Sequence, residues 1–137
     1  MRKLILKASL LAVFFIGLSF SSCGGVDHSD PQSVADAALE CYDVGDYAKL
    51  KTLVSPKNES LQKECDNMIQ MAEKASEKYP DKVYEKKVRT FKSATEEFTG
   101  AELTDASHSA DVRYEGDYPR RVILEKVDGK WYFERFK

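Results

Sequence analysis

Residues suited to acid–base catalysis are scarce in this chain of 137 residues, which has only two histidines. His28 precedes the first predicted helix, where we expect it to be exposed to solvent. His108 stands at the start of a predicted strand on the same side as Tyr114, whereas Asp111 has the opposite parity and points to the other face. A general base needs its partner within hydrogen-bond reach. The spacing therefore predicts no dyad of His108 with Asp111, and a strand-end histidine partly in water is the simpler interpretation.

Sequence motifs for metals, nucleophiles and phosphate groups are also missing. The sequence has no His-x-x-x-His, no Cys-x-x-Cys and no dense acidic loop, which are the patterns of zinc and calcium sites. It has no Gly-x-Ser-x-Gly motif, and its Gly24-Gly25 pair stands outside the predicted helices and strands. We therefore expect no metal, no other cofactor and no enzymatic activity.

A set of aromatic residues is the remaining candidate for a site. Tyrosine and tryptophan suit ligand pockets because each offers a flat apolar face with one polar group. Together with one histidine, these residues could line a cavity between helices and sheet: Tyr42, Tyr84, Phe91, Phe98, His108, Tyr114 and Trp131. The alternative is that most of them fill the core.

The N-terminal segment has the order of a secretory signal. Three basic residues precede an uncharged run over residues 8–20. As a helix this run would span about 20 Å, which is short of the ~30 Å hydrocarbon core of a bilayer. The run therefore fits a cleaved signal better than a transmembrane helix.

The residues after this run define the expected mature N-terminus. Two serines are followed by Cys23. This order resembles a bacterial lipobox, in which the cysteine is acylated and becomes the new N-terminus, and several acyl chains on one residue anchor a protein stably. We expect a lipoprotein signal peptide at 1–22, lipid attachment at Cys23, a flexible tether at 23–30 and one folded domain at 31–137. Ordinary secretion with an unmodified Cys23 is the alternative.

Charge and size narrow the class of protein. The first 22 residues carry three of the 21 basic residues and no acidic residue, so the other 115 residues have 18 basic and 23 acidic side chains and a net charge of −5. This acidic balance argues against nucleic acid as the main partner, because phosphate binding needs a basic patch. The length allows one domain, which excludes a multidomain enzyme.

Two cysteines remain if Cys23 is lipidated. Cys41 and Cys65 both lie on apolar faces of predicted helices. An even pair in an oxidising compartment can form a disulfide, and two buried thiols that pack as small hydrophobes are the alternative. The sequence leaves both open, because it does not report the distance between the two Cα atoms.

Helices are predicted in the first half of the domain. Asp30-Pro31 is an N-cap followed by proline, and Gly45 ends the helix that this pair begins. A short second helix follows Asp46. A long third helix is expected to begin at Ser55-Pro56 and to stop at Tyr79-Pro80.

Strands are predicted from Val83 onward, where alternation replaces helical spacing. The clearest strands cover 108–115, 121–127 and 131–136, and the Asp128-Gly129 pair predicts a hairpin turn between the last two. Weaker patterns suggest earlier strands over 83–92 and 98–104.

The order of elements predicts the fold class. Helices followed by a run of strands indicate an α+β fold, with N-terminal helices packed on a curved antiparallel sheet. Alternation within the last strand places Trp131, Phe133 and Arg135 on one face, with Tyr132 and Phe136 on the other.

Two stretches carry a resemblance to a known family. One runs from Asp30-Pro31-Gln32-Ser33-Val34-Ala35 to Gly45-Asp46-Tyr47, and the other from Val122 through Asp128-Gly129 to Phe133. They resemble the first helices and last hairpin of nuclear-transport-factor-2-like (cystatin-like) cone domains, in the uncharacterised lumazine-binding-like group of small secreted lipoproteins from Bacteroides-type bacteria. The resemblance covers residues 31–137 and implies a cone of helices and curved sheet. It selects no function, because isomerases, dehydratases, transport factors and binding modules share this fold.

Three functions stay open from the sequence. The favoured one is a lipid-anchored, non-catalytic protein of the cell envelope that binds a small molecule or another envelope protein. No aspartate follows Cys23 directly, so the outer membrane is the expected location. An isomerase- or dehydratase-like enzyme with a pocket acid or base is one alternative. A structural module that forms a homodimer is the other.

Overall fold

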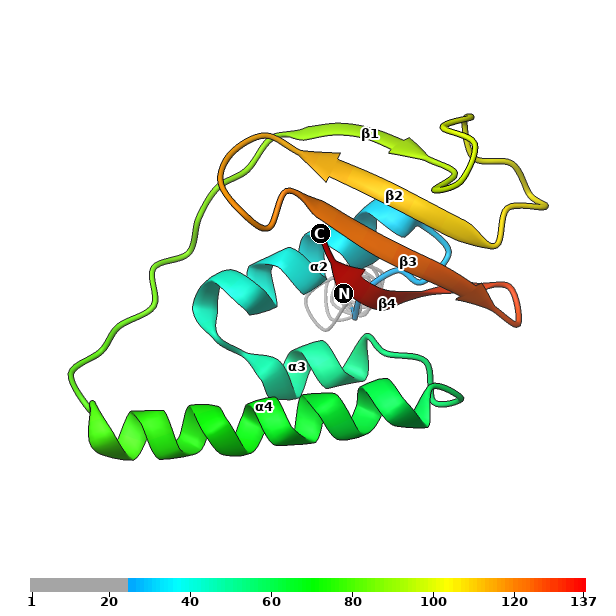
Figure 1. Cartoon of the computed structure of the whole chain (residues 1–137). Coiled ribbons are helices and arrows are strands. Elements are labelled where there is room, and N and C mark those ends of the chain that lie inside the picture. Colours follow the sequence, from blue (N-terminus) through cyan, green and yellow to red (C-terminus); the bar gives the residue numbers. More distant parts are fainter. Residues whose placement is uncertain (1–24) are drawn as a thin grey trace, which may run out of the picture.

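Three helices pack on an open four-stranded antiparallel sheet in the structure, a computed structural model that describes residues 25–137 (Figure 1). The predicted signal peptide and Cys23 lie outside the described residues. The helices come first: α2 (Pro31–Val44), α3 (Tyr47–Thr52) and α4 (Glu59–Lys78). The strands follow in the order β1 (Phe91–Thr95), β2 (Ser109–Tyr114), β3 (Arg121–Val127) and β4 (Lys130–Phe136). The predicted α+β class, with helices before strands, is confirmed.

The first two helices begin and end at the residues that the sequence indicates. Asp30 caps α2 by accepting a hydrogen bond from the amide of Gln32 at 3.0 Å. Gly45 ends α2 in the left-handed conformation, with φ of 72°, which glycine adopts at little cost. Asp46 then caps α3.

The third helix begins later than predicted. Pro56 lies in a turn, and Asn58 is the N-cap of α4. The chain before this turn is tied to the sheet, because the amide of Phe133 donates to the carbonyl of Leu53 at 2.8 Å. Val54 also forms an isolated parallel bridge with Phe133. Pairing with β4 therefore competes with the local start signal and delays the helix.

The sheet is a meander in which each strand pairs with the next one along the chain. Both residues of the β3–β4 turn have positive φ, 52° at Asp128 and 78° at Gly129, as the predicted hairpin turn requires. A bulge interrupts the pairing of β3 with β4, because Leu124 lies opposite Phe133 whereas Ile123 lies opposite Arg135. Glu134 is the extra residue of this bulge.

The bulge corrects the predicted faces of the last strand. Phe133 belongs to the core, and Phe136 packs against the same core. Arg135 instead pairs with Ile123 of β3, and Ile123 pairs with Asp111 of β2. Arg135 therefore lies on the same face of the sheet as Asp111, which is not the face of Phe133. The alternation rule fails here because one extra residue exchanges the two faces of the strand.

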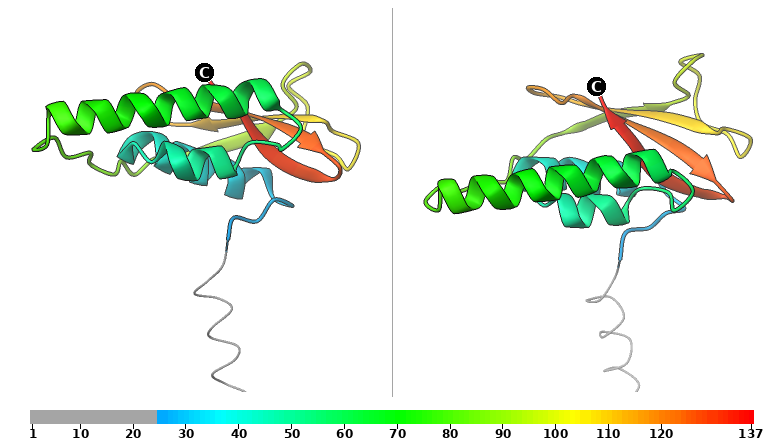
Figure 2. Two further views of the ribbon diagram at one scale, coloured as in Figure 1. Left: turned by 90° about the horizontal axis from the view of Figure 1, so that it is seen from below. Right: turned by 60° about the horizontal axis from the view of Figure 1, so that its bottom comes forward.

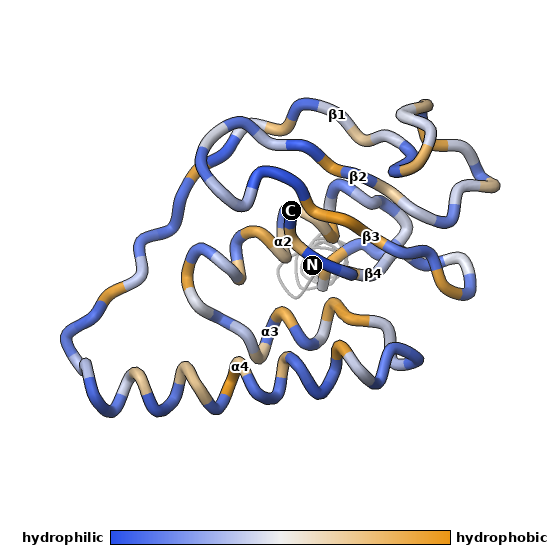
Figure 3. Tube along the Cα trace, viewed as in Figure 1, coloured by the Kyte–Doolittle hydropathy of each residue, from blue (hydrophilic) through white to orange (hydrophobic). Residues whose placement is uncertain are grey.

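The core lies between α2 and the inner face of the sheet. Buried side chains of α2 meet buried side chains of the strands: Val34, Ala38, Leu39, Cys41, Val112, Val122, Leu124 and Phe133. Leu50 of α3 and Cys65 of α4 extend this core. Apolar residues gather on these elements, whereas α4 alternates between polar and apolar positions (Figure 3). Within residues 25–137, no helix combines the length and apolar character needed to cross a bilayer.

The two weaker strand predictions are wrong for most of their length. Residues 82–90 run from α4 to β1 without regular secondary structure (Figure 1). No neighbouring strand pairs with them in the described part of the chain, and Val83 and Val88 are exposed. A buried ion pair holds this segment to α2, since Arg89 Nη2 lies 2.6 Å from Asp43 Oδ1. Of residues 98–104, only Glu102 pairs, in an isolated bridge with Thr95.

The segment before α2 is not the free tether that the sequence suggested. His28 is partly buried, and its carbonyl accepts a hydrogen bond from the amide of Trp131 at 2.7 Å. Val26 packs against the core. From Val26 onward the chain is therefore part of the domain.

Candidate functional site

A cavity of about 280 Å³ lies between α4 and the second half of β4. Its walls are mostly apolar and come from all three helices, from the β2–β3 turn and from β4: Tyr42, Leu50, Leu61, Cys65, Met68, Tyr118, Phe133 and Phe136. Three charged residues complete the lining, Glu64, Glu134 and Arg135. An apolar hollow with a few polar groups is the usual form of a small-molecule site.

Aromatic contacts build one wall of this cavity. The ring of Tyr42, near the end of α2, meets the ring of Phe136 edge-on, with 5.1 Å between centroids. It meets the ring of Tyr118 in the same manner at 6.3 Å. The ring centroids of Phe133 and Phe136, both on β4, lie 4.6 Å apart. Edge-on and tilted pairs of this kind are favourable, so the wall is held by its own packing.

The bulge in β4 places two charged residues at the cavity. Glu134 is half-buried, and the guanidinium of Arg135 donates to both Glu134 and Glu97. Burial raises the pKa of Glu134, and the charges of Glu97 and Glu125 act in the same direction while Arg135 opposes them. Glu134 is thus a carboxylate beside an apolar wall. The positive charge of Arg135 is already compensated by the carboxylates of Glu134 and Glu97.

Cys65, which is buried, also lines the cavity, and its thiol is expected to be unreactive. Burial is the main cause that raises the pKa of Cys65 above its ordinary value. Burial likewise raises the pKa of Cys41 to about 11. A thiol with a raised pKa stays protonated near neutral pH and is a poor nucleophile. Both cysteines are free and buried in the structure, so their arrangement is that of two packed thiols rather than a disulfide.

Only one of the seven predicted pocket residues, Tyr42, lines this cavity. Phe91 and Tyr114 meet edge-on at 6.3 Å beside a more open groove between α2 and residues 86–91. There the hydroxyl of Tyr114 donates to Asp36. Burial, followed by the contact with Asp36, raises the pKa of Tyr114, so the phenol remains a donor. Asp36 itself is exposed, and His108 is not among the residues of this groove.

The other four predicted residues lie apart from one another. Trp131 is buried in the core, and Tyr84 packs over Gly45 while remaining half-exposed. Phe98 is 83% exposed and His108 is exposed. The structure therefore does not gather the predicted aromatic set around one cavity.

Sequence reasoning missed most of the lining residues for identifiable reasons. Tyr118 lies in a turn, and Leu61 and Met68 belong to a helix face that reads as ordinary core. Regular alternation predicts Phe136 on the opposite face, because the sequence of β4 gives no sign of the bulge at Glu134. The apolar stripe of the predicted third helix was the one available signal.

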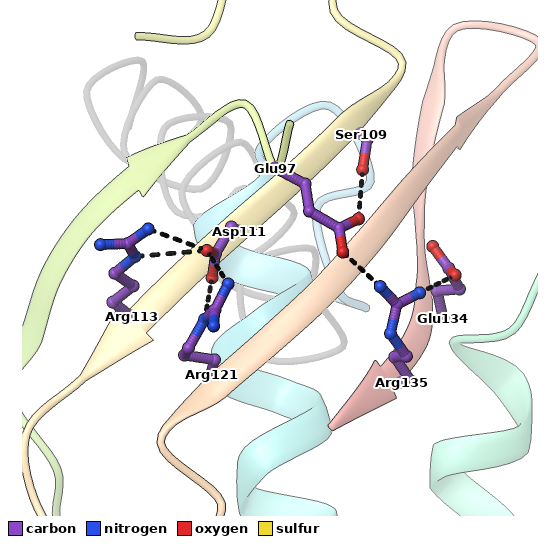
Figure 4. A network of polar contacts seen from close by, with 7 residues as sticks. All are labelled: Glu97, Ser109, Asp111, Arg113, Arg121, Glu134 and Arg135. Atoms are coloured by element: carbon purple, nitrogen blue, oxygen red, sulfur yellow. Dashed lines mark hydrogen bonds and ion pairs between the residues drawn. The ribbon is translucent and has the colours of Figure 1, made fainter. Parts of the chain in front are cut away.

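A polar network covers the opposite face of the sheet (Figure 4). Asp111 on β2 is fully buried and accepts hydrogen bonds from Arg113 and Arg121, with Arg121 Nε at 3.0 Å from Oδ1. Burial opposes ionisation of Asp111, but the hydrogen bonds and charges of Arg121 and Arg113 outweigh it and lower the pKa of Asp111. Glu97 joins this face by accepting from Ser109 and Arg135. Because these groups satisfy one another, we interpret the network as structural.

The structure shows no candidate metal site within residues 25–137. No group of three or more His, Cys, Asp or Glu side chains there could hold a metal ion.

Comparison with known proteins adds no relative: no family model, no curated protein and no solved structure matches this chain.

Proposed function

We propose that the protein is a lipid-anchored binding protein of the cell envelope that takes a small, flat molecule into the cavity between α4 and β4. The observation that carries this proposal is the cavity itself, about 280 Å³ with aromatic and aliphatic walls and few polar groups. Its volume is near the lower end of the range for ligand sites, which suits a ligand of one or two rings.

The charges at the cavity favour a neutral or cationic ligand. Glu64 and Glu134 both line it, whereas the guanidinium of Arg135 is engaged by Glu97 and Glu134. An ammonium group on the ligand would compensate the partly buried charge of Glu134, and a carboxylate would add a like charge. Tyr42 and Tyr118 also line the cavity, and tyrosine combines an apolar ring with a polar hydroxyl.

The anchor and the cone fold are parts of the same proposal. The basic, apolar and small-residue order before Cys23 supports acylation of that cysteine. Helices over one face of a four-stranded antiparallel sheet are compatible with a nuclear-transport-factor-2-like cone. A Cys23→Ala variant is expected to leave the membrane fraction, and membrane association that survives this change would contradict the anchor.

Two indole probes of opposite charge test the ligand class. The full chain, reconstituted in nanodiscs, is titrated with tryptamine and with indole-3-propionate, and binding is followed by saturation-transfer NMR against empty nanodiscs. We expect tryptamine to bind several-fold more tightly, because its ammonium group meets the acidic lining. Equal binding of both probes would contradict the proposed selectivity, and binding of neither would contradict the site.

A matched pair of helix variants locates the binding. Met68 lines the cavity, whereas Met71 lies one turn further along α4 and is exposed. Met68→Trp is expected to fill the cavity and abolish tryptamine binding, and Met71→Trp is expected to leave it unchanged. Loss of binding in both variants, or in neither, would place the probe elsewhere.

A further inference from the structure

We infer that the side of the domain bearing residues 26–30 and the β3–β4 turn rests against the lipid headgroups, and that the ligand cavity opens away from the bilayer. This inference rests on the proposed acylation of Cys23 and adds to it an orientation and a source for the ligand.

The chain is fixed to the domain very close to the proposed anchor. The Nδ1 atom of His28 lies 2.6 Å from the carbonyl oxygen of Trp131, whose amide donates back to the carbonyl of His28 at 2.7 Å. The His28 ring packs on Tyr132 at 5.0 Å between centroids, and Val26 packs against the core. These contacts join the segment before α2 to the first residues of β4.

The remaining chain is too short to let the domain move far from its anchor. Three residue steps separate Cys23 from Val26. Fully extended, they span about 11 Å at most. The seven residues of β3, which run from the β2–β3 turn to the β3–β4 turn, span about 20 Å or more. The side of the domain next to Val26 is therefore held within about 11 Å of the proposed anchor, whereas the far end of β3 lies about one strand length from the β3–β4 turn.

The arrangement of the elements shows which side this is. In both views of Figure 2, residues 25–30 leave the domain on the side of α3, while the C-terminus and the β2–β3 turn lie on the opposite side. The contact of His28 with Trp131 places the β3–β4 turn near the anchored side. The cavity extends from Leu50 of α3 to Tyr118 and Phe136, which belong to the distant end of β3 and β4.

The charges on the anchored side set the kind of surface that fits. Lys57 pairs with Asp128 at 2.7 Å, and residues 26–30 and 126–130 carry two further aspartates, Asp27 and Asp30, and two further lysines, Lys126 and Lys130. This side carries no strong excess of either sign, so the contact needs no anionic lipid, and a zwitterionic headgroup layer is a sufficient partner.

The orientation identifies where the ligand comes from. With the cavity turned away from the bilayer, its ligand arrives from the aqueous phase and is a water-soluble molecule rather than a membrane lipid. This agrees with the polar lining that Glu64 and Glu134 supply.

Site-directed labelling of the lipidated full chain tests the orientation. Lys130→Cys places a fluorophore beside the β3–β4 turn, and Asp117→Cys places one in the β2–β3 turn; both native residues are exposed. Buried Cys41 and Cys65 resist labelling under native conditions because their pKa values are raised. Each labelled protein is reconstituted in phosphatidylcholine vesicles that contain a lipid with a headgroup nitroxide. We expect the label at position 130 to be quenched several-fold more than the label at position 117.

An insertion variant supplies the matched control. A twelve-residue Gly-Ser insertion between Gly25 and Val26 leaves every contact of His28 in place and lengthens only the tether. We expect it to reduce the difference between the two labels several-fold, and equal quenching of the two labels without the insertion would overturn the orientation. Mass analysis of the N-terminal peptide reports the lipid separately: lipid on Cys23 with equal quenching leaves the anchor intact, whereas Cys23 without lipid overturns the anchor and this inference together.

Discussion

A buried carboxylate is unfavourable unless it is paired and hydrogen-bonded. Asp111 meets this condition with one arginine of its own strand, Arg113, and one of the next strand, Arg121. Arg113 and Arg121 lie directly opposite each other in the register of β2 and β3. Like charges in that position repel each other. The negative charge of Asp111 offsets this repulsion, and the two arginines in turn supply the hydrogen bonds that the buried carboxylate needs. The pair of arginines is partly exposed, which reduces the electrostatic gain through solvent screening.

Asp111→Asn is therefore expected to destabilise the domain by about 2–3 kcal/mol in urea unfolding, because it removes the charge from a fully buried, hydrogen-bonded site. The pKa of Asp111 is lowered in the folded state, so its stabilising effect is present above its unfolded pKa and is lost as the pH falls through the lowered folded value. The difference in the free energy of unfolding between wild type and Asp111→Asn should therefore become smaller at acidic pH. Asp81→Asn, at an exposed position, is the control and should leave stability unchanged at every pH.

Glu134 makes a pH-dependent prediction for binding. Its pKa is raised by burial, so it takes up a proton at a higher pH than an ordinary glutamate. Tryptamine affinity should fall as the pH is lowered through this raised pKa, because the lining loses its negative charge while the probe stays cationic. Glu134→Gln should bind tryptamine more weakly above that pKa and show less change with pH. A titration in which wild type and variant have the same pH profile would contradict this role.

At the scale of elements, the end of α2 combines a backbone requirement with a packing contact. Gly45 has φ of 72°, and a Cβ at this position would lie 3.2 Å from Cε2 of Tyr84. Gly100 has a similar φ of 66° but nothing within 4 Å of the same built atom. A comparison of alanine substitutions at the two glycines therefore separates the cost of backbone strain from the cost of contact with Tyr84.

Gly100→Ala is expected to cost about 1 kcal/mol for the left-handed conformation alone, and Gly45→Ala is expected to cost more because the Tyr84 ring must move as well. In a Tyr84→Ala background, the cost of Gly45→Ala should fall to that of Gly100→Ala. Urea unfolding of the two glycine variants, of Tyr84→Ala and of the double variant measures these differences. Equal costs for the two glycine changes in the presence of Tyr84 would show that the ring moves freely.

Local sequence signals predicted the elements that depend on local chemistry. Asp30-Pro31 and Gly45 bound α2 as expected, and Asp128-Gly129 forms the turn between β3 and β4. Signals failed where distant contacts decide the structure. The start of α4 follows the pairing of Val54 with β4. Residues 82–90 have strand-like alternation, but within residues 25–137 no strand pairs with them.

The candidate site was less predictable than the fold for the same reason. A bulge that depends on the pairing of two strands moved Phe136 to the inner face and brought Glu134 to the cavity. Tyr118 reaches the cavity from a turn, where neither helical nor strand periodicity applies. Of the predicted set only Tyr42 lines the site, because its place at the end of α2 follows from a helix that the sequence did define.

At the scale of the whole molecule, the proposals assign different tasks to the two ends of β4. Its first residues hold the segment that leads to the proposed anchor, and its last residues line the cavity. Binding at one end and attachment at the other leave the cavity accessible while the protein stays on the membrane. The proposed function requires that this cavity, rather than the open groove beside Tyr114, takes a ligand.

The methionine methyl groups give the most direct test of that claim. The chain has three methionines, of which Met1 belongs to the predicted signal, Met68 lines the cavity and Met71 is exposed on the same helix. Intermolecular NOEs between bound tryptamine and ¹³C-labelled methionine methyl groups in the nanodisc-bound protein report which of them the ligand touches. We expect NOEs from the indole protons to Met68 and none to Met71. Saturable binding with no NOE to Met68 would contradict binding in this cavity.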